Sequence, residues 1–298
     1  MGITLALLAM LCFASNIIIV RSAAARLSVD LGFIVLLTTN VLCISVVSVV
    51  EALLRETPLE WQWRGAAWFV ASGIIGIFLG RRMLLDTVVA LGAARASVVH
   101  SSSPVFTLIG AWLIIDERLG VYELCLMAVV IVGLWITQLS ASGPRSAARL
   151  SPSALRRGML VGMLAVAGFG LGNALRGVAM RGWDEAIFGT LIATVSALAC
   201  HLVSVRDWDK VGVALRSGDR RGMALFVASG VASAAGSMLT TSAMHYIEIA
   251  IATLITFTTP LVIFPVTVFL LGNREGLSWR SACGALLVLA GVVLLAVR

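Results

Sequence analysis

The sequence predicts an all-α integral membrane protein with ten transmembrane helices, arranged as two five-helix inverted repeats. Composition is the first observation behind this prediction. Hydrophobic residues make up 60% of the 298 positions and charged residues 12%, against about 45–50% and about 25% in soluble domains. A span needs about 20 mostly apolar residues, so ten spans leave no room for a separate globular domain.

The second observation is the regular alternation of apolar segments with charged or turn-forming connections. We expect helices at residues 3–22, 31–52, 65–91, 93–115, 121–140, 158–180, 186–205, 220–245, 247–271 and 277–297. The first segment has the length of a secretory signal, but no Lys or Arg precedes its apolar stretch and further spans follow it. We therefore expect it to be retained as the first span.

The third observation is an internal repeat. The connection at 141–157 is rich in Ser, Pro and Arg, and it separates a first repeat at 1–140 from a second at 158–298. Residues 91–115 align without gaps on 247–271, which places Pro104 on Pro260, and a similar shift places Asn16 on Asn173. Because five helices are an odd number, the second repeat enters the membrane from the opposite side, as inverted repeats of transporters do.

The net charge of +7 does not indicate nucleic-acid binding, because most basic residues lie between the apolar segments, where they set membrane orientation. One side carries 14 of them: Arg21, Arg26, Arg95, Arg145, Arg149, Arg156, Arg157, Arg206, Lys210, Arg216, Arg220, Arg221, Arg274 and Arg280. The other side carries 6: Arg55, Arg64, Arg118, Arg176, Arg181 and Arg298. We expect a multi-pass protein of the cell (inner) membrane with both termini outside the cytoplasm, no nucleic-acid partner, and the lipid bilayer as its surroundings.

Cofactor and metal chemistry find no motif in the sequence. The five cysteines lie singly inside apolar segments without a CxxC or metal spacing. No GxxxxGK[ST] phosphate loop occurs, so we expect no direct coupling to ATP. The sequence "HYIE" at 245–248 holds two potential ligands, yet no further ligand of suitable spacing accompanies them. We therefore expect neither a cofactor nor a bound metal.

Two stretches carry a family resemblance. Residues 101–136, "SSSPVFTLIGAWLIIDERLGVYELCLMAVVIVGLWI", and 258–295, "TTPLVIFPVTVFLLGNREGLSWRSACGALLVLAGVVLL", resemble the repeat signature of the drug/metabolite transporter (DMT) superfamily in its ten-helix EamA-type branch. The shared pattern is a proline, an acidic helix end at Glu117 or Glu275, and a last helix with glycines. The resemblance implies a secondary transporter and an exporter. It does not specify the substrate, because relatives move amino acids, purines, sugars, nucleotide sugars and drugs. It also implies cytoplasmic termini, the reverse of the charge count.

Charged residues in the third helix are the strongest local signal. Arg81, Arg82 and Asp86 lie near its middle, where each charge costs at least about 2.5–3.5 kcal/mol. Arg82 and Asp86 share a face and can form an ion pair, which is the structural interpretation. One carboxylate cannot neutralise two guanidinium groups, so we expect at least one arginine to face the transport pathway.

Further polar residues occur at matched positions of both repeats. Asn16 and Asn173 would offer amides to a central site, or hydrogen bonds between helices. Arg176, one turn from Asn173, faces the pathway or extends its charge to the interface. Prolines in the fourth and ninth helices leave the carbonyls of His100 and Thr256 without their helical donors. These carbonyls could bind substrate or mark a hinge, or the proline could simply kink the helix.

The sequence therefore predicts substrate-binding residues, hinges and a coupling candidate. The substrate-binding set is Asn16, Arg81, Arg82, His100, Ser102, Asn173 and Arg176, and the hinges are Pro104 and Pro260. Asp86 is the candidate for proton coupling because it is the one acidic residue well inside a predicted span, although the adjacent Arg82 favours its charged form and weakens that role.

These residues favour a secondary active transporter that exports a small polar metabolite by alternating access. Cations and amides without an unpaired interior carboxylate indicate a carboxylate-bearing or anionic substrate such as an amino acid, since the arginine fork matches carboxylates. A drug or lipophilic-cation exporter is the alternative, although the first helix carries Asn16 and no acid. A polytopic membrane enzyme is a remote third possibility. Such enzymes generally carry long catalytic loops, whereas the longest connection here is the Ser- and Arg-rich one. We expect no enzymatic activity.

Overall fold

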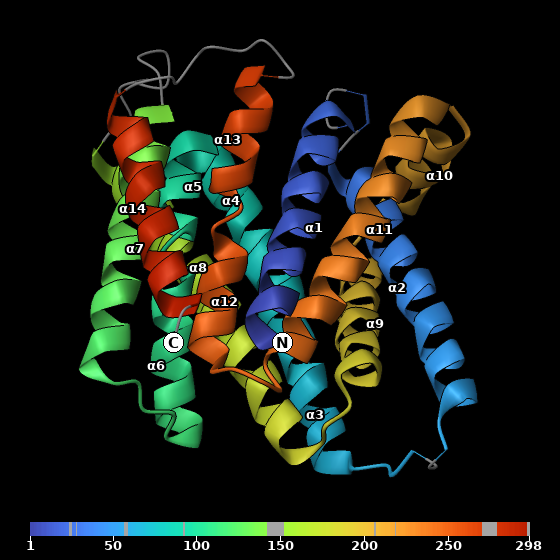
Figure 1. Cartoon of the computed structure of the whole chain (residues 1–298). Helices are drawn as coiled ribbons and strands as arrows, with labels where there is room; N and C mark the ends of the chain where they lie inside the picture. Colours follow the sequence, from blue (N-terminus) through green and yellow to red (C-terminus); the bar gives the residue numbers. More distant parts are fainter. Residues whose placement is uncertain are drawn as a thin grey trace.

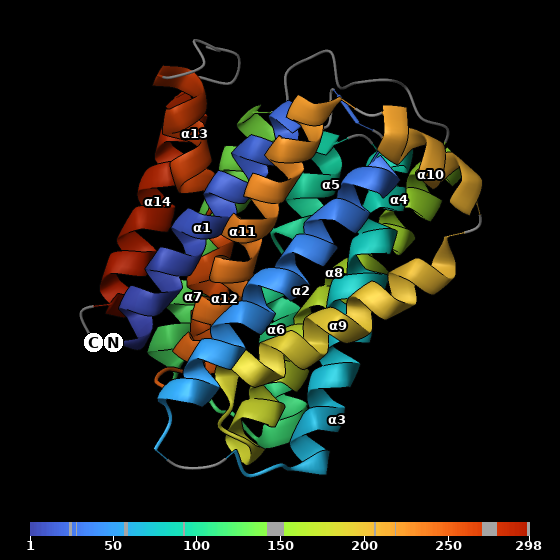
Figure 2. The ribbon, with the colours of Figure 1, turned by 90° about the vertical axis from the view of Figure 1, so that its right-hand side faces the viewer.

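The computed structural model of the chain is a bundle of helices (Figures 1 and 2). It describes residues 1–23, 26–27, 29–56, 59–91, 93–141, 152–205, 207–217, 219–269 and 279–296. The helices of the first half are α1 (Gly2–Ala23), α2 (Val29–Leu54), α3 (Trp63–Ser72), the π-helix η1 (Gly73–Gly80), α4 (Arg81–Leu91), α5 (Ala93–His100), α6 (Ser103–Ile115) and α7 (Val121–Ala141). Those of the second half are α8 (Pro152–Gly182), α9 (Ala186–Ser204), α10 (Trp208–Ser217), α11 (Arg220–Ala243), α12 (Ile249–Phe257), α13 (Pro260–Phe269) and α14 (Trp279–Ala296).

Three of the predicted helices are interrupted. The segment 93–115 breaks between α5 and α6, and 247–271 breaks between α12 and α13; each break directly precedes Pro104 or Pro260. Proline has no backbone N–H and clashes with the preceding turn, which explains both breaks. The segment 65–91 contains the π-helix η1, whose wider turn replaces the α-helical pattern.

Two boundaries differ from the prediction. Helix α8 begins at Pro152, inside the predicted connection 141–157, of which residues 142–151 lie outside the described part. The short helix α10 occupies a connection where no helix was expected. Both differences concern segments shorter or more polar than a span, where hydropathy is a weak guide.

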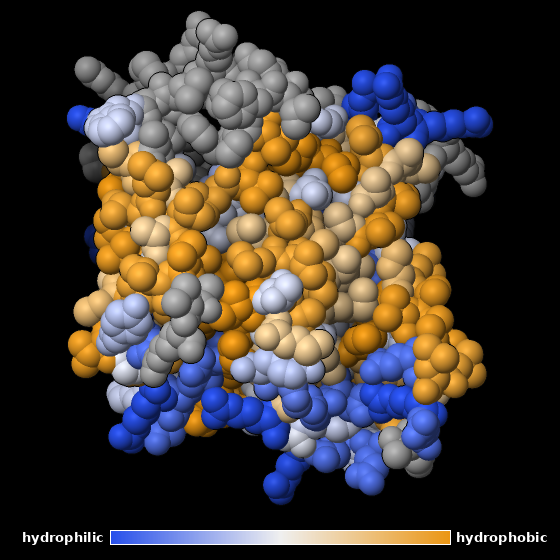
Figure 3. Space-filling model, viewed as in Figure 1, coloured by the Kyte–Doolittle hydropathy of each residue, from blue (hydrophilic) through white to orange (hydrophobic). Residues whose placement is uncertain are grey.

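Hydrophobic helices of membrane-spanning length recur along the chain. Within the described residues, six helices are long and apolar enough to cross a bilayer: Gly2–Val20, Leu31–Leu54, Val98–Ile115, Leu155–Gly182, Ala186–Ser204 and Arg220–Ala243. Shorter apolar helices cover Val121–Thr137, Ile249–Ile263 and Cys283–Leu295. Figure 3 shows hydrophobic side chains across the middle of the molecule and hydrophilic ones gathered at its lower end. The protein is therefore a membrane-embedded, multi-pass protein.

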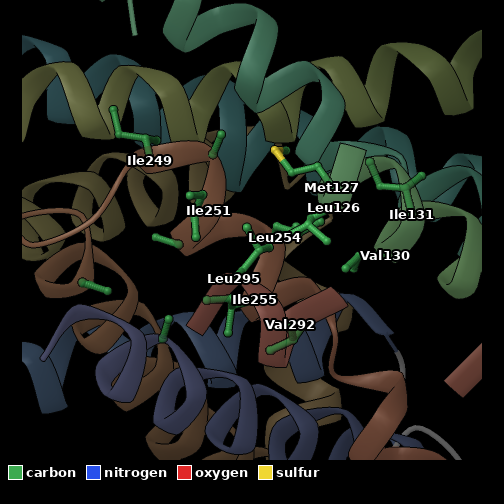
Figure 4. Packing of buried hydrophobic residues seen from close by; sticks show 14 of the residues in the cluster. Leu126, Met127, Val130, Ile131, Ile249, Ile251, Leu254, Ile255, Val292 and Leu295 are labelled. Carbon is green, nitrogen blue, oxygen red and sulfur yellow. The ribbon is translucent and has the colours of Figure 1, made fainter. Parts of the chain in front are cut away.

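Helices distant in sequence pack side by side. Helix α1 lies along α11, α7 lies along α14, and α8 packs against α6 and against the continuous column formed by α3, η1 and α4. The largest hydrophobic cluster joins α7, α12 and α14 (Figure 4). Its fully buried members include Val130, Leu254 and Ile255. This cluster anchors α12, one of the helices that line the site described below.

The approach of η1 to α8 depends on glycine. A Cβ on Gly172 would lie 2.5 Å from the Cα of Gly76, closer than any real contact. Beside this contact, the Ser72 hydroxyl donates a hydrogen bond of 2.7 Å to the carbonyl of Gly172. Small residues allow helix backbones to touch in this way. The contact places the start of α4, and with it Arg81, beside α8.

Candidate functional site

A cavity of about 760 Å³ lies among helices of both halves. The predicted residues that line it are Asn16, Arg81, His100, Asn173, Arg176 and Pro260. They come from α1, α4, α5, α8 and α13. Helices separated by more than a hundred residues in sequence thus contribute to one cavity, which has the size of a small-molecule site.

Helix α8 presents one continuous face to the cavity. Phe169, Gly172, Asn173 and Arg176 all line it, and their spacing of three and four residues places them on one side of an α-helix. Arg176 is 7% exposed, and its buried Nε has no hydrogen-bond partner within the described ranges. Its side chain therefore faces the cavity instead of extending to the membrane interface.

Arg81 reaches the same cavity from the opposite column. It is half-buried at the first position of α4, directly after η1. Its guanidinium carbon lies 4.8 Å from the ring centroid of Phe33 on α2. This is a cation–π contact, which holds the charge without neutralising it.

The charges of the cavity are unbalanced. No Asp or Glu is among its lining residues, and neither Arg81 nor Arg176 forms an ion pair within the part of the chain that the structure describes. A buried charge without a partner is costly. An arrangement of this kind is typical of a site that an anion completes.

His100 is enclosed by aromatic rings. Its ring centroid lies 4.7 Å from that of Phe169 and 5.1 Å from that of Phe257. Its Nδ1 is buried and has no hydrogen-bond partner among the described residues. His100 ends α5, so the break before Pro104 is what turns this ring into the cavity.

Amides of three helices complete the polar part of the site. The Nδ2 of Asn16 donates a hydrogen bond of 2.7 Å to the carbonyl of Ser229 on α11. Asn173 lines the cavity from α8. Asn40 on α2 also lines it; its Nδ2 donates to Ser233 at 3.3 Å, whereas its buried Oδ1 has no partner in the described part of the chain. Asn40 was not predicted, although a lone amide inside an apolar span is a readable signal.

Hydroxyl groups from the second half form much of the remaining wall, and the sequence analysis missed most of them. They are Thr194, Ser233, Ser237, Thr240, Thr253, Thr256 and Thr259. Several satisfy themselves by hydrogen bonds to the carbonyl four residues earlier, as Thr240 does to Gly236 and Thr256 to Ala252. The buried hydroxyl of Thr253 has no hydrogen-bond partner among the residues that the structure describes.

Four predicted residues do not line the cavity. Arg82 and Asp86 are exposed, and no ion pair between them occurs among the described residues. Arg82 and Asp86 lie one turn apart on the same face of α4. The adjacent face of this helix, which carries Arg81, lines the cavity. Ser102 accepts a hydrogen bond of 3.2 Å from the indole N–H of Trp135, and Ser101 lines the cavity instead. Pro104 is buried beside the break and outside the cavity lining.

Ion pairs join the two halves below the cavity, at the end that lies lowest in Figure 1. The buried Glu117 accepts a hydrogen bond of 2.8 Å from Arg181 and one of 3.3 Å from the backbone N–H of Ala250, at the start of α12. Burial raises the pKa of Glu117. The acidic residue of the repeat signature thus organises a helix terminus; Glu275 lies outside the described residues.

A second ion pair lies at the same end. Arg55, after α2, donates a hydrogen bond of 2.7 Å to Glu185, before α9, and another of 3.0 Å to Glu51. The hydrogen bonds to Glu185 and Glu51 raise the pKa of Arg55 further above its already high value. At the opposite end, Arg26 pairs with Asp219 at 2.8 Å, and both side chains are exposed.

Among the described residues, no group of three or more His, Cys, Asp or Glu side chains comes together in a way that could hold a metal ion. His245 of the "HYIE" sequence instead contacts Asp184 at 2.8 Å, which makes it part of a connection between α8 and α12.

A multi-pass helical protein with a cationic cavity between its halves has the architecture of a membrane transporter. The sequence comparison agrees: residues 1–139 and 156–297 both match the EamA-like transporter family. The chain belongs to this family, which is part of the DMT superfamily and consists of membrane transporters, not enzymes.

Other comparisons address the fold. Among curated proteins, no sequence matches the chain. A solved structure described as "Crystal structure of protein" aligns with a TM-score of 0.73 over 98% of this chain and 97% of the other, at 16% identity. Identity this low supports a shared fold and nothing more specific.

Proposed function

We propose that the protein is a secondary active transporter that exports a small polar, carboxylate-bearing or anionic metabolite, such as an amino acid, by alternating access. The observation that carries this proposal is the presence of Arg81 and Arg176 in one cavity whose described lining contains no carboxylate. Export itself rests on the family.

The free-energy cost of unpaired arginine charges in the empty site favours an anionic substrate. Moving a charge from water to the protein interior is costly unless a partner of opposite sign is present. Arg176 has only 7% of its surface exposed and no ion-pair partner among the described residues. A carboxylate accepts two parallel hydrogen bonds from such a guanidinium group, so substrate binding removes the imbalance.

Two inverted five-helix repeats are supported by the helix pairing. Exchanging the halves maps α1 on α8 and α11 on the column of α3, η1 and α4. The packing of α1 against α11 then corresponds to that of α8 against α3 and α4, and both occur. Likewise the contacts of α1 with α12 and α13 correspond to those of α8 with α5 and α6, and the pair of α7 with α14 maps on itself. Related packing of two repeats around one site is what alternating access requires.

The conformation is proposed to be closed at the end that carries Arg55 and Glu117. Both residues bond to partners in the second half, Glu185 and Arg181. Pro104 and Pro260 lie in the first turns of the helices that follow the two breaks and are proposed as hinges. Rocking of one repeat against the other would break these pairs, open the route at this end and close the route at the opposite end.

For the membrane we propose the cell (inner) membrane. The excess of basic residues on the side of Arg26 and Lys210 places that side in the cytoplasm and both termini outside it.

The proposal is tested by thermal stabilisation of the detergent-purified protein against a panel of anionic, zwitterionic and cationic metabolites. Ligands that bind the folded state raise its apparent stability by mass action. We expect carboxylates to stabilise the wild type and Arg82→Gln, but not Arg176→Gln. Arg176→Lys, which keeps the charge but loses the fork, should retain a weaker effect. Stabilisation by lipophilic cations alone would replace this proposal with a drug exporter.

A further inference from the structure

Arg81 and Arg176 lie at different depths of the same cavity. The Cβ of a residue at Gly80 would lie 3.2 Å from Phe169, and that of Gly76 would lie 3.0 Å from the Cα of Gly172. Numbers rise along η1 as they fall along α8, so the two helices run antiparallel and Arg81 is level with Phe169. Arg176 follows Phe169 by seven residues, which corresponds to about 10 Å along the helix.

The space between the two arginines is suited to the body of a ligand. The rings of Phe169, His100 and Phe257 pack together in the cavity wall, at the level of Arg81. The cavity lining also carries polar atoms that have no partner among the described residues, the Oδ1 of Asn40 on α2 and the hydroxyl of Thr253 on α12. The cavity thus offers two cations at different depths, and aromatic and polar groups in the same lining.

A single negative charge does not balance this cavity. If one carboxylate bound Arg176, Arg81 would keep its charge with only the Phe33 ring beside it. The guanidinium group of Arg81 makes no hydrogen bond within the described chain, so none has to be broken when an anion approaches. Two cations without carboxylates are balanced by two anionic groups, and their separation requires these groups at the two ends of one molecule.

We infer that the site binds an elongated dianion, a molecule with an anionic group at each end of a short chain, held at one end by Arg176 and at the other by Arg81. This inference rests on the proposed transport of an anionic metabolite and names its substrate class. A molecule with both charges on one group, such as inorganic phosphate, lacks the second anionic group that this inference pairs with the other arginine.

The experiment compares ligands matched in length but not in charge. Glutarate and adipate are titrated into the purified full-length protein at constant ionic strength beside butyrate, hexanoate and inorganic phosphate, and apparent affinities are taken from the rise in melting temperature. We expect at least one dicarboxylate to bind about tenfold or more tightly than its monocarboxylate counterpart. Arg81→Gln and Arg176→Gln should each reduce this ratio to about 1, whereas the adjacent Arg82→Gln should preserve it.

Each of the other outcomes overturns a defined part of the inference or of the proposed function. Equal binding of mono- and dicarboxylates by the wild type overturns the dianion but leaves the anionic site standing. Phosphate binding as tight as that of the dicarboxylates overturns recognition at two separate points. The absence of binding by every anion contradicts the proposed function as well. If a glutamine variant does not fold, Arg81→Lys and Arg176→Lys are used, for which we expect a reduced ratio; an unchanged ratio would contradict the inference.

Discussion

Gly76 and Gly172 meet so closely that a Cβ on Gly172 would lie 2.5 Å from the Cα of Gly76. This contact holds the π-helix η1 against α8 and thereby places Arg81 and Arg176 on the same cavity. We predict that Gly172→Ala lowers the stability of the protein by about 1–3 kcal/mol, the usual cost of overpacking, and weakens anion binding. Gly182→Ala, on the same helix with nothing within 4 Å, should do neither. Thermal unfolding of both variants is the measurement, and equal melting temperatures would contradict the contact.

Glu117 gives the protein a pH-dependent stability. Its pKa is raised by burial in the folded state, so the folded protein binds more protons than the unfolded chain between the two pKa values. The free energy of unfolding therefore decreases as pH rises through this window. Arg181 and the Ala250 N–H favour the charged form, and the nearby Glu248 opposes it. We predict that Glu117→Gln removes this decrease, as measured by melting temperature against pH; an unchanged profile would exclude Glu117 as its source.

The Arg55 ion pair is predicted to stabilise the closed end of the molecule. Its partner Glu185 is largely buried, with 13% of the side chain exposed, and hydrogen bonds to charged groups contribute about 1.5–3 kcal/mol. Arg55→Gln should therefore lower the melting temperature, and the exchange Arg55→Glu with Glu185→Arg should restore part of it. Arg118→Gln serves as the control, because Arg118 and Asp116 are both exposed and such pairs contribute little. If Arg55→Gln were as stable as Arg118→Gln, the Arg55 ion pair would not stabilise the closed end.

Asp86 is predicted to be dispensable for coupling. The sequence analysis named it as the proton-coupling candidate, but its side chain is exposed and outside the cavity lining. We expect Asp86→Asn to transport with the pH dependence of the wild type in proteoliposomes. Loss of that dependence would restore Asp86 to the mechanism.

The orientation is open to a direct test. The charge count predicts both termini outside the cytoplasm, whereas the family resemblance implies the reverse. We expect a C-terminal alkaline phosphatase fusion, which is active outside the cytoplasm, to show activity, and a C-terminal green fluorescent protein fusion to remain dark. A fluorescent fusion protein would contradict this orientation and show that the C-terminus lies in the cytoplasm.

The helices were largely predictable because hydropathy determines where a chain crosses a bilayer. The breaks before Pro104 and Pro260 followed from proline chemistry as well. The π-helix η1 was not predictable, because "GIIGIFLG" is as compatible with an α-helix as with a π-helix. Helix α10 is too short for a span and its pattern is that of a connection.

The site was predictable in its chemistry more than in its geometry. Cations and amides inside spans have few structural uses, which is why Arg176, Asn16 and Asn173 were identified. Arg81 and Arg82 are adjacent and differ by about 100° around a helix, so only packing against α8 decides which one lines the cavity. The cavity-lining hydroxyl groups of α11 and α12 were not predicted, because Ser and Thr are common in helices of every role.

The most direct test of an anion-carrying cavity is the current across a solid-supported membrane of proteoliposomes after a concentration jump of glutarate, butyrate or tetraphenylphosphonium, with protein-free liposomes as background. We predict a protein-dependent current whose sign corresponds to inward movement of negative charge with a carboxylate, an unchanged current in Arg82→Gln and none in Arg176→Gln. A protein-dependent current with tetraphenylphosphonium alone, unaffected by Arg176→Gln, would contradict the account.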